Sequence, residues 1–84
     1  MATTEEQFAE AQKKVKQLAA TPANDKLLQL YSLYKQGSTG DASGKRPGML
    51  DIRGRAKYDA WASRKGMSRD DAMTAYVKLV DSLG

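Results

Sequence analysis

Cysteine and histidine are both absent from the 84 residues, and proline occurs only twice. Without cysteine the chain can form neither a disulfide framework nor a thiolate nucleophile, and without histidine it lacks the commonest metal ligand and general base. We therefore expect no catalytic residues, no metal site and no cofactor. No apolar run approaches the roughly 20 residues of a membrane-spanning helix. The N-terminal residues include acids where a signal peptide carries bases, so the expected location is cytoplasmic.

The hydrophobic and charged fractions, 40% and 29%, are those of an ordinary folded protein, and the length suits a single domain over residues 1–84. The net charge of +4 is unevenly distributed, because residues 45–65 carry seven bases and two acids while the rest of the chain sums to −1. A basic segment of this kind suits the phosphates of a small ligand, a nucleic acid or a membrane surface. The same charges suit a plain solvated face equally well.

Hydrophobic periodicity predicts an all-α fold with four helical segments. Capping or turn-forming residues bound each segment. The predicted segments are about residues 4–20 with a cap at Thr3 or Thr4, about 25–37 with a cap at Asn24 or Asp25, about 51–65 ended by Gly66, and a fourth from a cap at Ser68 to about residue 83.

The second segment has an unusually wide nonpolar side, formed by Leu27, Leu28, Leu30, Tyr31, Leu33 and Tyr34. Such a helix is covered on more than one side: either it sits centrally among other helices, or part of its apolar face belongs to a ligand. Lys35 falls within this arc, four residues after Tyr31 and on the same face. Because a protein core has no use for an unpaired ammonium group, Lys35 and Tyr31 are candidates for ligand binding.

A glycine- and serine-rich stretch over residues 37–48 resembles a phosphate-binding loop in composition. Its spacing is wrong, because Gly40 and Gly44 enclose three residues rather than four and Arg46 stands where serine or threonine is required. We therefore reject a nucleoside-triphosphatase.

The order of features between Tyr31 and Trp61 is more specific than any single one. The run Tyr31-Ser32-Leu33-Tyr34-Lys35-Gln36, the pair Gly40-Asp41, the run Arg46-Pro47-Gly48-Met49-Leu50-Asp51 and the run Arg55-Ala56-Lys57-Tyr58-Asp59-Ala60-Trp61 together resemble the acyl-CoA-binding protein family. Phe8, Pro22 and residues 71–76 also fall where that family has them, so the resemblance covers nearly the whole chain. It implies a small four-helix bundle with a long crossover loop between the second and third helices. It also implies non-catalytic binding, transport and buffering of a long-chain acyl-CoA.

The resemblance further implies a ligand-binding set, namely Lys16, Tyr31, Tyr34, Lys35, Lys57 and Tyr76. Tyr31, Tyr34, Lys35 and Lys57 would hold the nucleotide head, with the 3′-phosphate as its main electrostatic anchor. Tyr76 would reach the head from the last helix, and Lys16 would approach from the first. Tyr76 also lies on an apolar stripe, where it is equally expected to pack against Phe8.

The sequence departs from the family pattern at three positions. Arg53 and Arg55 stand where lysines are usual, and Tyr58 stands where a tryptophan is common. These changes leave the expected ligand contacts in place but leave the preferred chain length of the ligand open. The remaining bases Arg64, Lys65 and Arg69 are expected to be plain surface.

The main alternative is a small basic helical nucleic-acid-binding domain that uses residues 45–65. Asp51 and Asp59 interrupt that basic run, which argues against it. A thioesterase would need a base to activate Ser32, Ser38 or Ser43, and the chain has no histidine. A protein-protein adaptor stays open. We expect a monomer that binds acyl-CoA and no nucleic acid, with transient membrane contact also open.

Overall fold

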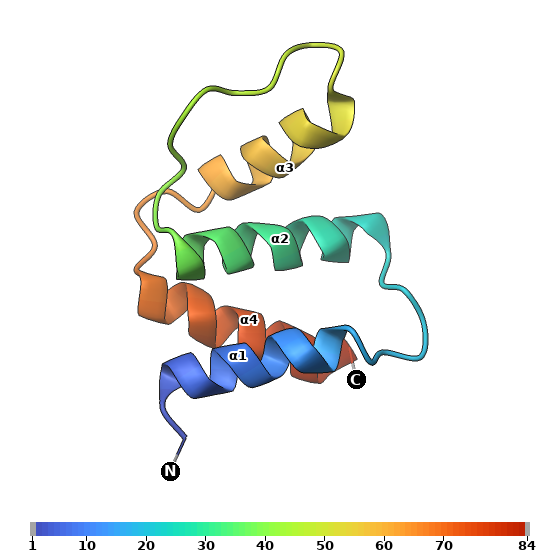
Figure 1. Ribbon diagram of the computed structural model, residues 1–84, viewed down its shortest axis with the longest axis vertical. Coiled ribbons are helices and arrows are strands. Elements are labelled where there is room, and N and C mark those ends of the chain that lie inside the picture. The colour runs from blue at the N-terminus through green and yellow to red at the C-terminus, as the bar shows by residue number, and fades with distance from the viewer. Residues whose placement is uncertain (1, 84) are drawn as a thin grey trace.

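The computed structural model describes residues 2–83, which contain four helices and no strand: α1 (Thr4–Val15), α2 (Asn24–Ser38), α3 (Ile52–Ala62) and α4 (Arg69–Leu83). The helices are stacked in the order α3, α2, α4, α1, and the long connection between α2 and α3 crosses over the outer side of α3 (Figure 1). Both the all-α fold and the long crossover are therefore confirmed.

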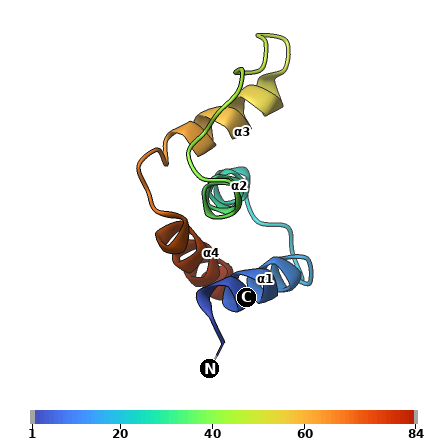
Figure 2. The same ribbon diagram turned by 60° about the vertical axis from the view of Figure 1, so that its left-hand side comes forward.

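The central position of α2 explains its wide nonpolar side. One side of α2 packs against α4 and another against α3, which a view close to the α2 axis shows plainly (Figure 2). Leu30 and Leu33 are buried on α2, while Leu27 and Tyr34 stay partly open. The helix is thus both a core element and the wall of a more accessible surface.

The hydrophobic core lies where α1, α2 and α4 meet, and its buried members are Phe8, Ala11, Leu30, Leu33, Ala72, Met73, Tyr76 and Val80. Gly37 allows this close approach. A Cβ at that position would lie 3.1 Å from the Met73 Cγ and 3.2 Å from the Phe8 Cζ. The core therefore depends on a residue without a side chain at the end of α2.

Two helix starts have the predicted caps, at Thr3 and Ser68, and α3 has a cap of the same kind at Asp51 that was not predicted. The side chains of Thr3, Asp51 and Ser68 each accept a hydrogen bond from the backbone N–H three residues later, at 3.1, 2.9 and 3.0 Å. The cap predicted at Asn24 or Asp25 is wrong, because α2 already includes both residues and begins without a side-chain cap.

Two predicted helix ends are also wrong. The first helix ends at Val15 rather than near residue 20, since the N–H groups of residues 16 and 17 bond to carbonyls three residues back. Beyond them Leu18 is only half-buried and Ala19 is exposed, so no packing supports another helical turn. The third helix ends at Ala62, and tight turns lead from it to Gly66.

A buried amide determines where the chain leaves these helices. Gln36 is fully buried, and its Nε2 donates hydrogen bonds of 2.8 Å to the Asp41 carboxylate and of 2.8 Å to the Met67 carbonyl. The same Asp41 oxygen accepts a 2.9 Å bond from the N–H of Gly66, whose φ of +91° suits glycine. The long loop and the α3–α4 turn are therefore both tied to α2.

Arg64 and Arg69 are not plain surface, contrary to the prediction. The Nε of Arg64 donates to the Ser32 hydroxyl at 3.1 Å. The Nε of Arg69 donates to the Gly37 carbonyl at 3.1 Å, and one of its terminal amino groups donates to the Ser38 carbonyl at 3.3 Å. Arg69 thereby satisfies two carbonyls at the C-terminal end of α2.

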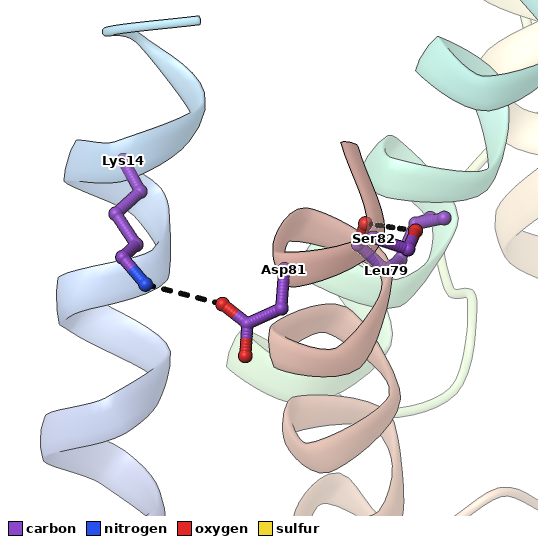
Figure 3. A network of polar contacts seen from close by, with 4 residues as sticks. All are labelled: Lys14, Leu79, Asp81 and Ser82. Atoms are coloured by element: carbon purple, nitrogen blue, oxygen red, sulfur yellow. Dashed lines mark hydrogen bonds and ion pairs between the residues drawn. The ribbon is translucent and has the colours of Figure 1, made fainter. Parts of the chain in front are cut away.

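An ion pair joins the two helices at the far side of the stack. Lys14 on α1 and Asp81 on α4 approach to 3.1 Å, as Figure 3 shows together with the hydrogen bond from the Ser82 hydroxyl to the Leu79 carbonyl. Both charged side chains are more than half exposed, so solvent screening leaves the pair little influence on stability. Within residues 2–83, no helix is both long and apolar enough to cross a membrane.

Candidate functional site

Two lysines from different helices lie at the contact between α2 and α3. The Nζ of Lys35 on α2 lies 4.8 Å from the centre of the Trp61 ring on α3. The Nζ of Lys57 on α3 lies 5.5 Å from the centre of the Tyr31 ring on α2. Each helix thus places an ammonium group over an aromatic ring of the other, a favourable geometry for a cation.

Within the described part of the chain, no carboxylate neutralises either ammonium group. Among residues 2–83, neither Lys35 nor Lys57 forms an ion pair with a carboxylate. The nearby Asp59 is already bound by Arg46 at 2.6 Å, and that guanidinium lowers the pKa of the Asp59 carboxyl. Two positive charges therefore remain available to an anionic ligand.

Tyr34 on α2 and Tyr76 on α4 both pack against Phe8 of α1. The ring of Phe8 lies 6.1 Å from that of Tyr34 and 5.1 Å from that of Tyr76, the second at an edge-to-face angle of 82°. Tyr76 is only 4% exposed, which confirms its expected packing against Phe8. Burial raises the pKa of the Tyr76 phenol, and the neighbouring Tyr34 raises it further.

A groove of about 440 Å³ opens between the first halves of α2 and α3, and it is lined by Asn24, Leu27, Leu28, Ile52, Arg53, Ala56 and Lys57. Its volume is within the range of small-molecule sites, and most of its lining is apolar. Lys57 belongs both to this groove and to the pair with Tyr31, so the apolar space directly adjoins the cationic one.

Lys16 is the predicted residue that the structure does not bring into either cluster. It follows the last turn of α1, its side chain is exposed, and no hydrogen bond or ion pair joins that side chain to residues 2–83. The other five predicted residues lie along α2 or on the helices that face it. The candidate site therefore runs along α2, from the groove past Lys57 and Lys35 to Tyr34 and Tyr76.

Sequence reasoning missed the groove residues on α3 and the role of Trp61. The wide nonpolar arc of α2 left a ligand-binding apolar face as one of two alternatives, but no pattern noted in residues 51–65 indicated that Ile52 and Ala56 would face it. Trp61 is buried. Its indole N–H donates to the Gly40 carbonyl at 2.7 Å while its ring lies beneath Lys35.

The departures from the family pattern have definite places in this structure. Arg53 lines the groove, where its planar guanidinium replaces the usual ammonium group. The hydroxyl of Tyr58 donates to the Gly44 carbonyl at 3.2 Å, and its ring packs at 6.2 Å from that of Trp61. Tyr58 thus holds the long loop against α3.

Nothing in this arrangement resembles an activated nucleophile. Ser32 is buried and engaged, because its hydroxyl donates to the Gln29 carbonyl at 2.8 Å and accepts from Arg64. The clustered groups are ammonium, phenol and apolar side chains, which suit the binding of an amphiphilic anion.

Comparison with known proteins gives a consistent result. The family model described as Acyl CoA binding protein matches residues 5–80. Acyl-CoA-binding protein homolog 1 of Caenorhabditis elegans is 50% identical over 76 residues, which are 90% of this chain and 88% of that protein. The acyl-CoA-binding protein homolog of Manduca sexta is 48% identical over 80 residues, which are 94% of this chain and 89% of that protein.

Solved structures give the same answer at the level of the fold. The crystal structure of Oryza sativa Acyl-CoA-Binding Protein 2 superposes with a TM-score of 0.92 at 38% identity, covering 96% of this chain and 90% of that one. The solution structure of Acyl Coenzyme A Binding Protein from yeast gives a TM-score of 0.73 at 43% identity, covering 90% of this chain and 88% of that one. On these matches in sequence and in structure, the chain belongs to the acyl-CoA-binding protein family.

Proposed function

We propose that this chain binds long-chain acyl-CoA esters without reacting with them, and that it carries and buffers them as a monomer in the cytoplasm. One observation carries the proposal: the unpaired ammonium groups of Lys35 and Lys57 lie beside an apolar groove that Lys57 itself lines. Coenzyme A presents phosphates at one end, and its thioester presents a hydrocarbon chain at the other. The two ends match the two halves of the site.

The nucleotide head is assigned to the aromatic and cationic residues along α2. Lys35, Lys57 and the hydroxyl of Tyr31 bind the 3′-phosphate through charge-assisted hydrogen bonds. A tyrosine ring stacks on the adenine, which contributes on the order of 1 to 3 kcal/mol. Tyr34 and Tyr76 complete the head site, and Lys16 adds a longer-range attraction.

The acyl chain is assigned to the groove between α2 and α3. Covering about ten methylenes at roughly 0.8 kcal/mol each supplies on the order of 8 kcal/mol before ordering costs. Calorimetry with acyl-CoAs of increasing length should therefore show rising affinity, with free coenzyme A and free fatty acid much weaker. Equal affinity for short and long esters would remove the groove from the site.

Charge removal tests the head site. Lys35→Met and Lys57→Met keep the apolar stem of each lysine and remove its ammonium group, so each should weaken palmitoyl-CoA binding about tenfold or more. Lys57→Met should also reduce the preference for 3′-phosphorylated over dephosphorylated esters. Lys78→Met, at an exposed position on α4, is the matched control and should bind normally. Wild-type affinity in both site variants would refute the assignment.

Tyr76 can be tested separately from its packing role. Tyr76→Phe keeps the edge-to-face contact with Phe8 and removes only the hydroxyl. A loss of about threefold or more in palmitoyl-CoA affinity, with unchanged thermal stability, would support contact with the ligand. Unchanged affinity would leave Tyr76 as a purely structural residue.

The alternatives predict different results in the same assays. Nucleic-acid binding would need an uninterrupted run of bases, yet Asp51 and Asp59 interrupt residues 45–65, and Asp59 is bound to Arg46 of the long loop. A mobility shift with generic DNA or RNA should therefore show no complex at concentrations that saturate acyl-CoA binding. Stable thioester absorbance over hours with excess protein is expected, whereas hydrolysis would contradict the carrier role.

A further inference from the structure

Three aliphatic side chains project into solvent at the point where the long loop enters α3. Met49 is 82% exposed, Leu50 is 100% exposed and Ile52 is 77% exposed. The backbone N–H of Asp51 bonds to the Gly48 carbonyl at 3.0 Å, which places Met49 and Leu50 at the two central positions of a tight turn. Single exposed apolar side chains are common on protein surfaces, whereas several gathered at one protruding turn indicate a surface for interaction.

The charges around this turn have one predominant sign. Lys45 precedes it, and Arg53 and Arg55 follow it in the first turns of α3. The only acid within the turn region, Asp51, directs its carboxylate to the N–H of Gly54 at 2.9 Å as the cap of α3. The turn is therefore an apolar tip with a cationic surround, which is the complement of an anionic lipid surface.

We propose that Met49, Leu50 and Ile52, named here the apolar tip, form a docking element that inserts into the headgroup region of anionic membranes. A protruding aliphatic tip suits a fluid lipid surface, whereas anchors in protein interfaces are enriched in tryptophan, tyrosine and arginine and depleted in leucine. The segment lies at the end of the stack beyond α3, away from α4 and α1, so a flat surface can approach it (Figure 1).

The position of the tip connects it to the groove. Ile52 belongs both to the apolar tip and to the groove lining, and Arg53 beside it lines the groove as well. A membrane bound at the tip would therefore meet the open side of the groove, where a hydrocarbon chain could pass between lipid and protein. This consequence for exchange depends on the proposed function, but membrane binding itself does not.

Vesicle co-sedimentation without any acyl-CoA tests the docking element by itself. The wild type should bind vesicles of phosphatidylcholine mixed with phosphatidylserine and bind pure phosphatidylcholine much more weakly. Met49→Ser combined with Leu50→Ser should weaken binding to the anionic vesicles about tenfold or more. Lys45→Gln should weaken it about fivefold, while Lys78→Gln, which removes the same charge from an exposed position on α4, should have little effect.

Two further measurements make the outcome decisive. In the Leu50→Trp variant, brominated lipid chains should quench the fluorescence of the introduced tryptophan. The fluorescence of the buried Trp61 in the wild type should not be quenched. Calorimetry with soluble palmitoyl-CoA should give wild-type affinity for the Met49→Ser, Leu50→Ser double variant, which separates membrane docking from ligand binding. Equal vesicle binding by wild type and double variant would overturn the proposal and assign the tip to a protein partner. Weaker soluble binding would overturn it in favour of an acyl-chain contact.

Discussion

Replacing Gln36 with leucine tests whether the buried amide holds the two connections in place. Leucine is close to glutamine in volume, so the substitution opens little cavity and mainly removes polar contacts. The half-buried Met67 carbonyl loses its 2.8 Å bond, at a cost of about 1 to 3 kcal/mol. Asp41 is exposed, so water replaces the bond that its carboxylate loses.

Removal of the Gln36 Oε1 has a smaller and opposite effect on the free energy of unfolding. The Oε1 of Gln36 is buried and has no hydrogen-bond partner among residues 2–83, so removing it relieves a desolvation cost of about 1 kcal/mol. The expected net loss in the free energy of unfolding therefore lies between about 0 and 2 kcal/mol, centred on about 1 kcal/mol. For a domain of this size, a loss of about 1 kcal/mol lowers the melting temperature by roughly 4 to 8 °C.

Urea denaturation followed by circular dichroism measures this difference directly. Gln29→Leu makes the same chemical change at a half-buried position of α2, where the side chain forms no hydrogen bond to residues 2–83, and should change stability by less than about 0.5 kcal/mol. If both variants unfold at the same urea concentration, the two hydrogen bonds of Gln36 do not stabilise the fold and the reasoning is refuted.

The structure also determines the direction in which two other substitutions change stability. Gly37→Ala should destabilise the protein by about 1 to 3 kcal/mol in urea denaturation, because its Cβ would crowd side chains of α1 and α4, whereas Gly48→Ala has free space and should be neutral. The amide of Gln36 and the N–H of Gly66 lower the pKa of Asp41 in the folded protein. The ionised Asp41 therefore stabilises the fold at pH values above the ordinary carboxyl pKa, and this stabilisation is lost as the pH falls through the lower, folded-state pKa. Acid titration of Asp41→Asn should therefore show a shallower loss of stability below pH 4 than the wild type, and parallel curves would contradict this.

Local sequence signals predicted the helices well but predicted several helix ends poorly. Periodicity placed all four helices, and short-range spacing predicted a cap at Thr3 or Thr4 and one at Ser68, of which Thr3 and Ser68 are observed. The end of α3 depends on a different kind of contact, because the Asp41 carboxylate holds the N–H of Gly66 from 25 positions away. Such a contact has no local signature, so a helix continued to residue 65 was the natural expectation.

The same distinction holds for the candidate site. Lys35 could be singled out because an ammonium group stood within an apolar arc, and the structure places it over Trp61. Lys57 had no comparable local signal, since its partner Tyr31 lies on another helix. Arg64 was misjudged for the same reason, because its acceptor Ser32 is 32 positions away. Motif resemblance supplied Lys57, while the arginine had no such support.

Helix α3, which carries Lys57 and one wall of the groove, is the least buried of the four helices. Within residues 2–83, α3 packs against α2 alone, and Trp61 is its single buried residue. Its position therefore depends heavily on the loop, through the indole of Trp61 bonded to Gly40 and through Arg46 bonded to Asp59. Because these anchors also lie next to the site cations, the long loop is more than a connection. The loop is also bonded to α2 through Asp41 and Gln36, so it links the two helices that form the walls of the groove.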